Sequence, residues 1–315
     1  MKKPRVVVLG GCGFIGSHLA RALVAEDYSV RIFDKLYASH ELIQDIEPSV
    51  EVFEGDVERP QDVLNALSGA EICFHLIHTT VPGSSMQDPG FDVQSNVVSS
   101  VRWMAQMDRT SAKRLIYISS GGTVYGIPQG NPINEDHPTN PTSSYGISKL
   151  CIEKYALLYG QLYGIHTSIL RPSNVYGEGQ RLNIGQGLIG VYLNRLVHGE
   201  PIEVWGDGSV RRDYLYVRDL IRGVLGLIEY QGPYSLFNIS TGIGHSVLQI
   251  VEIIEEVLHE KPQIIFKPSR GFDVPINVLS SERLRTQTGW VPQTTLRQGI
   301  AQYFTWLQRG GRARD

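Results

Sequence analysis

The feature that most constrains the fold of this chain is a glycine-rich turn directly after its first apolar segment. Arg5–Leu9 is typical of a buried strand, and residues 10–16 follow it as Gly-Gly-Cys-Gly-Phe-Ile-Gly. The glycines fit G-x-G-x-x-G at Gly11, Gly13 and Gly16, and G-x-x-G-x-x-G at Gly10, Gly13 and Gly16. Glycine permits a tight turn and a close backbone approach, so that the N–H groups of the next helix can meet a pyrophosphate. A strand, this turn and a helix together predict a dinucleotide site.

The first half of the chain alternates short apolar segments with helical patterns. The predicted strands are Arg5–Leu9, 30–33, 50–53, Ile72–His75, 114–119 and 167–170, and the predicted helices are Phe14–Ala25, 60–67 and 93–107. Continuous Val, Ile and Leu runs separated by helices are typical of a parallel sheet that is covered on both faces. We therefore expect an α/β fold with a doubly wound parallel sheet of the Rossmann type.

The rhythm changes after Pro172. Glycine-rich stretches at 177–179 and 206–208 interrupt short strands and helices, including predicted helices at 217–228 and 247–259. We expect a smaller, mixed α/β lobe over residues 173–315. This lobe is interwoven with the first domain, residues 1–172, and sends segments back to it, with the ligand cleft between the two.

Composition excludes several classes of function. Apolar residues make up 42% of the chain and charged residues 19%, and the net charge of −3 supports neither a nucleic-acid nor a membrane-surface role. No apolar run approaches the roughly 20 residues that span a bilayer. The three cysteines, Cys12, Cys73 and Cys151, are far apart and odd in number, and the nine histidines lack metal-ligand spacing. We expect no metal, and thiols in a reducing cytoplasm.

Acidic residues after the second and third predicted strands indicate which dinucleotide binds. Asp34 ends the second strand, about 20 residues beyond the glycines, where a carboxylate accepts both adenosine ribose hydroxyls. It would also repel a 2′-phosphate, which favours NAD over NADP, although the nearby cations Lys35 and Arg31 weaken that preference. Asp56 and Val57 follow the third strand, where the adenine is expected.

A tyrosine and a lysine lie four residues apart after the fifth predicted strand. Tyr145 and Lys149 belong to a helical pattern, and positions i and i+4 share one face of a helix. An ammonium there is expected to lower the pKa of the tyrosine and make its phenolate a general base near neutral pH.

With this pair, the chain resembles the extended short-chain dehydrogenases, specifically the nucleotide-sugar epimerase/dehydratase family and its UDP-galactose 4-epimerase-like members. The resemblance covers nearly the whole chain. It rests on 10–16, 55–57, 74–76, Asn96, 119–126, 145–149, 171–177, 206–214 and 270–273.

The resemblance implies NAD-dependent 4-epimerisation of a UDP-sugar. Tyr145 would take the sugar hydroxyl proton while NAD⁺ takes the hydride, and the 4-keto intermediate would receive hydride on its other face. Lys149 would modulate Tyr145 and hold the nicotinamide ribose. Two helices from each subunit, 93–107 and 145–163, would form a homodimer interface.

The resemblance also implies ligand residues. The cofactor set is Gly10, Gly13, Phe14, Ile15, Gly16, Asp34, Lys35, Asp56, Val57, Leu76, Ile77, His78, Asn96, Ser119, Tyr145, Lys149 and Pro172. Towards the substrate, Asn174 would lie near the diphosphate, Arg212 and Arg270 would pair with phosphate, and Asp273 would accept the uridine ribose hydroxyls. For both arginines the alternative is a surface salt bridge.

Two positions depart from the family pattern. The family usually has Ser or Thr, which hydrogen-bonds the reacting oxygen, where this chain has Gly121. Ser120, Thr123 or a water could replace that hydroxyl, and we favour Thr123 as a catalytic residue. His78 stands where the family prefers a small residue, and it either binds substrate or makes a structural loop contact.

Related activities remain open. Dehydratases of the family use an Asp-Glu pair where this chain has Gly122 and Thr123, so dehydration is disfavoured. A UDP-uronate epimerase or decarboxylase remains an alternative, in which Arg181 could meet a carboxylate, as does a reductase. A non-catalytic NAD-sensing regulator is disfavoured, because such proteins typically lose the tyrosine or the lysine.

The last expectation concerns the size of the sugar. Asn277 aligns with the position that gates the pocket around the C2 substituent in the epimerase-like family. Asparagine is much smaller than tyrosine, so we expect N-acetylhexosamines to be admitted. The alternative is that Asn277 caps a turn after Pro275.

Overall fold

The computed structural model describes residues 3–180, 182, 187–269 and 274–311. Its centre is a parallel sheet of seven strands in the order β10-β6-β5-β4-β1-β2-β3. The strands are β1 (Arg5–Leu9), β2 (Ser29–Asp34), β3 (Glu51–Glu54), β4 (Ile72–His75), β5 (Arg114–Ile118), β6 (His166–Pro172) and β10 (Leu236–Ile239). The strand order reverses at β1, which makes the sheet doubly wound. The predicted fold class is confirmed.

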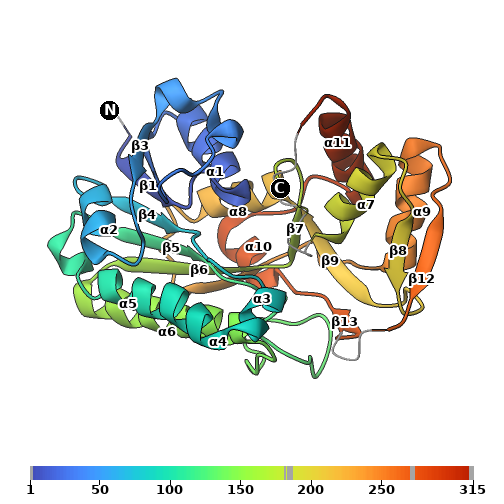
Figure 1. Cartoon of the computed structure of the whole chain (residues 1–315). Coiled ribbons are helices and arrows are strands. Elements are labelled where there is room, and N and C mark those ends of the chain that lie inside the picture. The colour runs from blue at the N-terminus through green and yellow to red at the C-terminus, as the bar shows by residue number, and fades with distance from the viewer. Residues whose placement is uncertain (1–2, 181, 183–186, 270–273, 312–315) are drawn as a thin grey trace.

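Both faces of the sheet are buried under helices. The side chains of β1 alternate between two cores, because successive strand residues point to opposite faces. Val6 and Val8 pack with α1 (Phe14–Ala25) and α8 (Val217–Gly226), whereas Val7 and Leu9 pack with the helices of the other face. Figure 1 shows the two helical layers on either side of the sheet. The helices of the second layer are α2 (Pro60–Ala66), α5 (Ser99–Met104) and α6 (Ser144–Tyr163).

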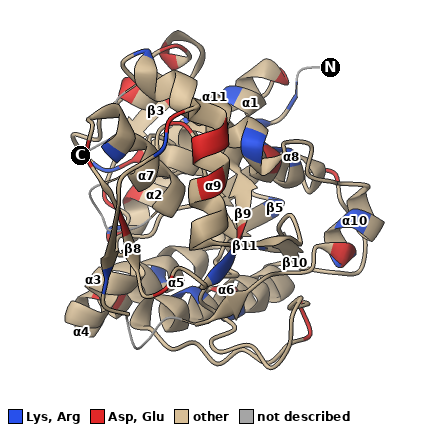
Figure 2. Cartoon of the chain, turned by 90° about the vertical axis from the view of Figure 1, so that its right-hand side faces the viewer, with Lys and Arg blue, Asp and Glu red and all other residues tan. Residues whose placement is uncertain are grey.

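The smaller lobe has its own core and short sheets. Its strands are β7 (Asn174–Tyr176), β8 (Ile202–Trp205), β9 (Arg211–Tyr216), β11 (Gly244–Ser246), β12 (Ile264–Lys267) and β13 (Ile276–Asn277). Its helices are α7 (Leu188–Val197), α9 (Val247–Leu258) and α11 (Leu296–Gln308). Figure 2 shows positive and negative residues interspersed on this side of the molecule, with acidic residues on α9.

The predicted helix over residues 93–107 is confirmed over residues 93–104, but its first half winds as a π-helix. The chain forms two short helices, α3 (Pro82–Gln87) and α4 (Pro89–Asp92), then a π-helical segment, η3 (Val93–Val98), before α5 begins. In the π segment the side chain of Asn96 bonds Thr79 and Asp92, groups outside the segment. This irregular winding places Asn96 where it can make both contacts.

The chain returns to the first domain after residue 173. Strand β10 pairs with β6, α8 packs on α1, and α10 (Glu282–Thr288) packs on β10. Because these later segments pack on the first domain, the predicted domain boundary at residue 172 stays a prediction. Within the described ranges, no helix is both long and apolar enough to cross a membrane. Short helical turns complete the fold: η1 (Glu41–Ile43), η2 (Glu47–Ser49) and η4 (Met107–Arg109).

Candidate active site

The glycine turn between β1 and α1 is built for a close approach. Gly10 has a φ of +88°, a left-handed conformation that favours glycine. A Cβ at Gly16 would lie 2.1 Å from the carbonyl oxygen of Gly10, so the first helical turn needs glycine there. No side chain caps α1 at Gly13. The N–H groups of this helix start are therefore available to a ligand, and the turn fits the pyrophosphate of a dinucleotide.

Asp34 lies at the end of β2 beside this turn. One oxygen of its carboxylate accepts a hydrogen bond from the backbone N–H of Cys12 at 2.9 Å, and the other from Lys35 at 2.9 Å. The carboxylate is thus fixed next to the glycine turn, where an adenosine ribose is expected.

Arg31, one of the cations expected to weaken the preference for NAD, is engaged within the protein. Its guanidinium is buried, donates to the carbonyl of Ser68 at 3.0 Å and pairs with Glu51 at 2.9 Å. These contacts already use its charge, and its effect on the choice of dinucleotide stays a prediction.

The segments after β3 and β4 place most of the other predicted cofactor residues. After β3, Asp56 accepts from the backbone N–H of Glu58 at 2.9 Å, and Val57 packs on the core. After β4, the backbone N–H of Leu76 donates to Leu9 at 3.0 Å, and Ile77 lies against Gly10, with its Cγ1 3.2 Å from where a Cβ of that glycine would be. The segment after β4 therefore borders the glycine turn, and the segment after β3 lies beside the end of β2, where the backbone N–H of Gly55 donates to the carbonyl of Asp34 at 2.9 Å.

Two predicted cofactor side chains are engaged within the protein. The amide oxygen of Asn96 accepts from the backbone N–H of Thr79 at 2.8 Å and so holds the loop after β4. The hydroxyl of Ser119 donates to Glu153 in a short hydrogen bond. In this structure, both side chains hold the surrounding protein in place.

Tyr145 and Lys149 lie on the first turns of α6. Ser143 caps the helix by accepting from the N–H of Gly146 at 3.2 Å. The buried Lys149 ammonium donates to the carbonyl of Ile118 at 2.9 Å and lies 5.8 Å from the centre of the Tyr145 ring.

The expected electrostatic effect of the lysine on the tyrosine is absent. Burial and the charge of Asp92 raise the pKa of Tyr145, and Lys149 does not counter this. Burial lowers the pKa of Lys149 to about 7, although Glu153 and Asp92 oppose the shift. The lysine is turned to the Ile118 carbonyl, to which it donates at 2.9 Å.

Sequence reasoning missed Asp92, whose side chain is fully buried beneath the start of α6. Its carboxylate accepts from Ser144 at 2.8 Å, from Ser148 at 2.6 Å and from Asn96 at 3.2 Å, with a further short hydrogen bond from Thr80. Burial alone would raise the pKa of Asp92, but the groups bonded to it hold that pKa well below its usual range. The one sequence signal was its position four residues before Asn96, on the same side of a helical turn.

His78 contacts the tyrosine directly. The two rings meet edge to face, with centroids 4.5 Å apart, and the His78 side chain is 5% exposed. Its Nε2 lies 3.6 Å from Asp92, and both ring nitrogens are buried without a hydrogen-bond partner. Burial lowers the pKa of His78 to about 4, which leaves the ring neutral at pH 7.

Position 121 has no room for a side chain. A Cβ on Gly121 would lie 2.3 Å from the side chain of Leu279 and 3.1 Å from the carbonyl oxygen of Pro172. The hydroxyl of Thr123 is buried without a partner, and Ser120 is half-buried. The departure at Gly121 is therefore built into the packing.

The predicted substrate residues of the smaller lobe meet on β7, β9 and β13. The Asn174 amide donates to the carbonyl of Asp213 at 3.1 Å, and the half-buried Arg212 donates to that of Val274 at 2.6 Å. Asn277 pairs with Arg212 between β13 and β9, and its buried side-chain oxygen has no partner. Because it lies in a strand, Asn277 does not cap a turn. The predicted residues Arg270, Asp273 and Arg181 lie outside the described residues.

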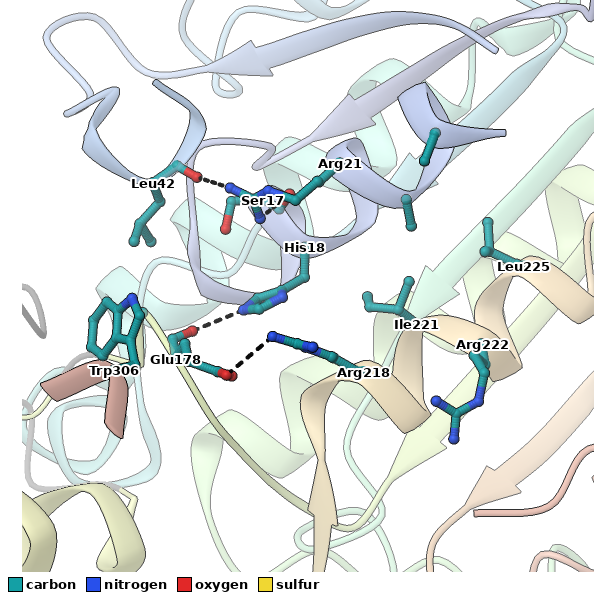
Figure 3. A pocket seen from close by; sticks show the side chains of 13 residues that line it. Ser17, His18, Arg21, Leu42, Glu178, Arg218, Ile221, Arg222, Leu225 and Trp306 are labelled. Atoms are coloured by element: carbon teal, nitrogen blue, oxygen red, sulfur yellow. Dashed lines mark hydrogen bonds and ion pairs between the residues drawn. The ribbon is translucent and has the colours of Figure 1, made fainter. Parts of the chain in front are cut away.

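A separate hollow of about 570 Å³ lies between α1, α8 and α11 (Figure 3). Its charged side chains pair with neighbours: Arg21 with Asp45 at 2.7 Å, and Arg218 with Glu178 at 3.3 Å. None of the residues that line it belongs to the group around Tyr145.

A glycine turn at the point where the strand order reverses, and a Tyr-x-x-x-Lys pair on the helix that precedes β6, define a dinucleotide-dependent enzyme of the extended short-chain dehydrogenase class. The model of the NAD dependent epimerase/dehydratase family matches residues 6–240. The chain belongs to this family, as the resemblance predicted, and its cofactor is NAD.

Two relatives and one solved structure illustrate the similarity. The UDP-glucose 4-epimerase of Mycolicibacterium smegmatis is 33% identical over 301 residues, which cover 94% of this chain and 96% of that protein. The dTDP-4-dehydro-6-deoxyglucose reductase of Escherichia coli is 31% identical over 310 residues, 95% of this chain and 96% of that one. The UDP-glucose 4-epimerase of Thermotoga maritima, solved with UDP-glucose, has a TM-score of 0.91 at 29% identity, with 97% of this chain and 99% of that chain covered.

Proposed function

We propose that this chain is an NAD-dependent 4-epimerase of a UDP-sugar, with Tyr145 as the base. The observation that carries the proposal is the place of Tyr145, on the first turn of α6 and against the loop that follows β4. That loop, which contacts Tyr145 through His78, also carries Leu76 and Ile77 beside the glycine turn. A sugar carbon held there meets both the base and the cofactor.

Each predicted residue has a proposed role in this reaction. Tyr145 removes and returns the proton of the sugar hydroxyl, and Lys149 holds the nicotinamide ribose. Bound NAD supplies a hydride acceptor that also gives the hydride back. Asp34 accepts the adenosine ribose hydroxyls. The remaining cofactor contacts are assigned to Gly10, Gly13, Phe14, Ile15, Gly16, Lys35, Asp56, Val57, Leu76, Ile77, His78, Asn96, Ser119 and Pro172.

The smaller lobe is assigned to the nucleotide. Asn174 lies near the diphosphate, and Arg212 pairs with a phosphate, where a guanidinium fork suits the geometry. On the basis of the sequence, Arg270 and Asp273 are also assigned to the nucleotide. The relatives of this chain include UDP-glucose 4-epimerases, which supports UDP as the nucleotide.

The test is turnover of a panel of UDP-hexoses, their N-acetyl forms and UDP-uronates, followed by NMR with the purified protein and its bound NAD. We expect interconversion of a 4-epimer pair without net change in the redox state of the cofactor. The proposal fails if no UDP-sugar in the panel is converted.

A reductase is the second candidate, and the similarity to the Escherichia coli dTDP-4-dehydro-6-deoxyglucose reductase favours it. A reductase consumes one equivalent of reduced cofactor for each sugar, whereas an epimerase consumes none. Loss of absorbance at 340 nm with a dTDP-4-keto-sugar, and no turnover of UDP-sugars, would identify it.

We also propose a homodimer built on α5 and α6. Apolar side chains on the outer face of α6 are exposed in the single chain: Ile147 by 54%, Leu158 by 46% and Leu162 by 63%. Burying such a face on its symmetry copy removes apolar surface from water. Light scattering at micromolar concentration should report twice the mass of the chain, and a monomer would refute the proposal. A cytoplasmic location is supported by the free thiols of Cys12, Cys73 and Cys151.

A further inference from the structure

His78 brings a buried imidazole nitrogen that lacks a partner to the base. Its Nδ1 is buried without a hydrogen-bond partner, whereas Nε2 lies 3.6 Å from the Asp92 carboxylate, and the side chain is 5% exposed. A buried polar group that lacks a partner costs free energy, and such groups are uncommon in native proteins. The cost is removed if a ligand supplies the missing partner.

Asp92 fixes what this imidazole can offer. Nε2 faces the Asp92 carboxylate at 3.6 Å, the nearer of the two nitrogens to a negative charge, so the ring proton is favoured on Nε2. In the neutral ring the other nitrogen, Nδ1, is then an acceptor. The carboxylate is held in turn by Ser144 and Ser148, on either side of Tyr145 along the chain. The orientation of the imidazole and that of the base thus depend on one carboxylate.

The contact with Tyr145 indicates which ligand group is within reach. The two ring centroids are 4.5 Å apart, so a sugar whose reacting hydroxyl meets the phenol also brings a neighbouring hydroxyl close to the imidazole. Thr123 approaches α6 through its backbone instead, with its carbonyl oxygen 2.9 Å from where a Cβ of Gly146 would be. Gly121 offers no side chain and has no space for one.

We propose that Nδ1 of His78 accepts a hydrogen bond from a sugar hydroxyl next to the reacting carbon and so holds the hexose ring against Tyr145. The imidazole makes no covalent bond and takes no proton. It positions the sugar for the proton transfer to Tyr145. This inference rests on the proposed function, because it needs a hydroxyl-bearing sugar ring at the base.

The first experiment replaces the imidazole. His78→Ala removes the acceptor, and His78→Asn returns an amide oxygen close to the former place of Nδ1. We expect His78→Ala to lower kcat for the best UDP-sugar about a hundredfold, the scale of a small misplacement of the reacting groups, and His78→Asn to recover at least tenfold of that loss. The affinity for UDP alone should stay within twofold.

The matched control is His166→Asn, which changes a histidine at the opposite, amino-terminal edge of the sheet, where it contacts Arg114 at 2.9 Å. Its kcat should equal that of the native enzyme. A kcat of His78→Ala within threefold of the native value overturns the inference. So does a loss that His78→Asn fails to reduce, because a purely structural defect would give that result.

The second experiment observes His78 in the native protein and does not depend on the activity of a variant. In protein labelled with ¹⁵N at histidine, the Nδ1 resonance of His78, assigned from His78→Asn, should shift with the UDP-sugar but not with UDP alone. Equal shifts for both ligands overturn the inference. If the native enzyme converts no UDP-sugar, the proposed function itself fails. If the native enzyme and His78→Ala are both active, only the inference about His78 fails.

Discussion

Arg171 and Glu153 form a fully enclosed, two-pronged ion pair between β6 and α6, with N–O distances of 2.9 and 2.6 Å and both side chains only 2% exposed. The same carboxylate accepts from Ser119, and the guanidinium lies 4.8 Å from the centre of the Tyr125 ring. The pair therefore anchors the helix that carries Tyr145 and Lys149 to the central sheet.

Breaking this pair should be costly. Arg171→Met leaves Glu153 as an uncompensated buried charge, so we expect the free energy of unfolding in urea to fall by about 3–5 kcal/mol. The double variant Glu153→Leu with Arg171→Met removes both charges and should be more stable than Arg171→Met alone. If the double variant is the less stable one, Glu153 is not an uncompensated charge in Arg171→Met, and its bond from Ser119 is enough to hold it.

The assignment of the base predicts the effect of removing one hydroxyl. Tyr145→Phe should lower turnover of the UDP-sugar at least about a hundredfold, the usual scale for loss of a positioned general base. NAD content should be nearly unchanged, because the ring remains. Steady-state kinetics and cofactor content measured on the same preparation check this, and near-normal activity would show that another group is the base.

The unpartnered hydroxyl of Thr123 gives a separate prediction. If it replaces the hydroxyl that Gly121 lacks, Thr123→Val should lower kcat with little change in KM, because the bond matters mostly in the transition state. Threonine and valine have nearly the same shape, so packing is preserved. An unchanged kcat would assign the task to Ser120 or to a water.

Burial of Lys149 predicts how stability depends on pH. Its pKa is lowered from 10.5 in the unfolded chain to about 7 in the folded protein. Between these values the unfolded state binds more protons, so the free energy of unfolding should rise with pH by up to about 1.4 kcal/mol per unit from this group. Below pH 7 both states are protonated and the contribution is constant.

The measurement is urea unfolding of the cofactor-free protein and of Lys149→Met at pH 7 and pH 9. The native protein should gain stability relative to the variant as the pH rises. A difference between the two proteins that is the same at both values would mean that Lys149 keeps an ordinary pKa when folded.

The place of Asn277 predicts the range of sugars. We expect the native enzyme to convert UDP-N-acetylhexosamines as well as UDP-glucose and UDP-galactose, since a small side chain at this position leaves room for the acetamido group. Asn277→Tyr should selectively lower kcat/KM for the N-acetyl sugars. The hypothesis is refuted if the native enzyme rejects them, a result that does not depend on whether the tyrosine variant folds.

Much of the first domain could be predicted because its signals are local. The continuous apolar run of Arg5–Leu9 and the glycine turn after it lie within a few residues of each other, and the structure has β1 and α1 at the predicted bounds. The pair Tyr145 and Lys149 shares a helix face for the same reason, since a spacing of four residues is a property of one helix.

What could not be predicted depends on contacts between distant segments. Asp92 gains its importance from Ser144 and Ser148, 52 and 56 residues away in the sequence. Arg31 resembled a surface cation until its partners at Ser68 and Glu51 were known. The Lys149 ammonium on α6 points to the carbonyl of Ile118 at the end of β5, 31 residues earlier in the sequence. None of these contacts leaves a periodic pattern.

The return of the chain to form β10 limits how this enzyme can change. A fragment that ended at Pro172 would leave β6 as an open edge, with unpaired backbone groups where Leu236–Ile239 now bond. The part of the chain that carries the substrate lobe also closes the cofactor sheet, so the two cannot be exchanged as modules between proteins. New sugar specificity has to arise by substitution within the loops and short strands around the site, on a scaffold inherited as one piece.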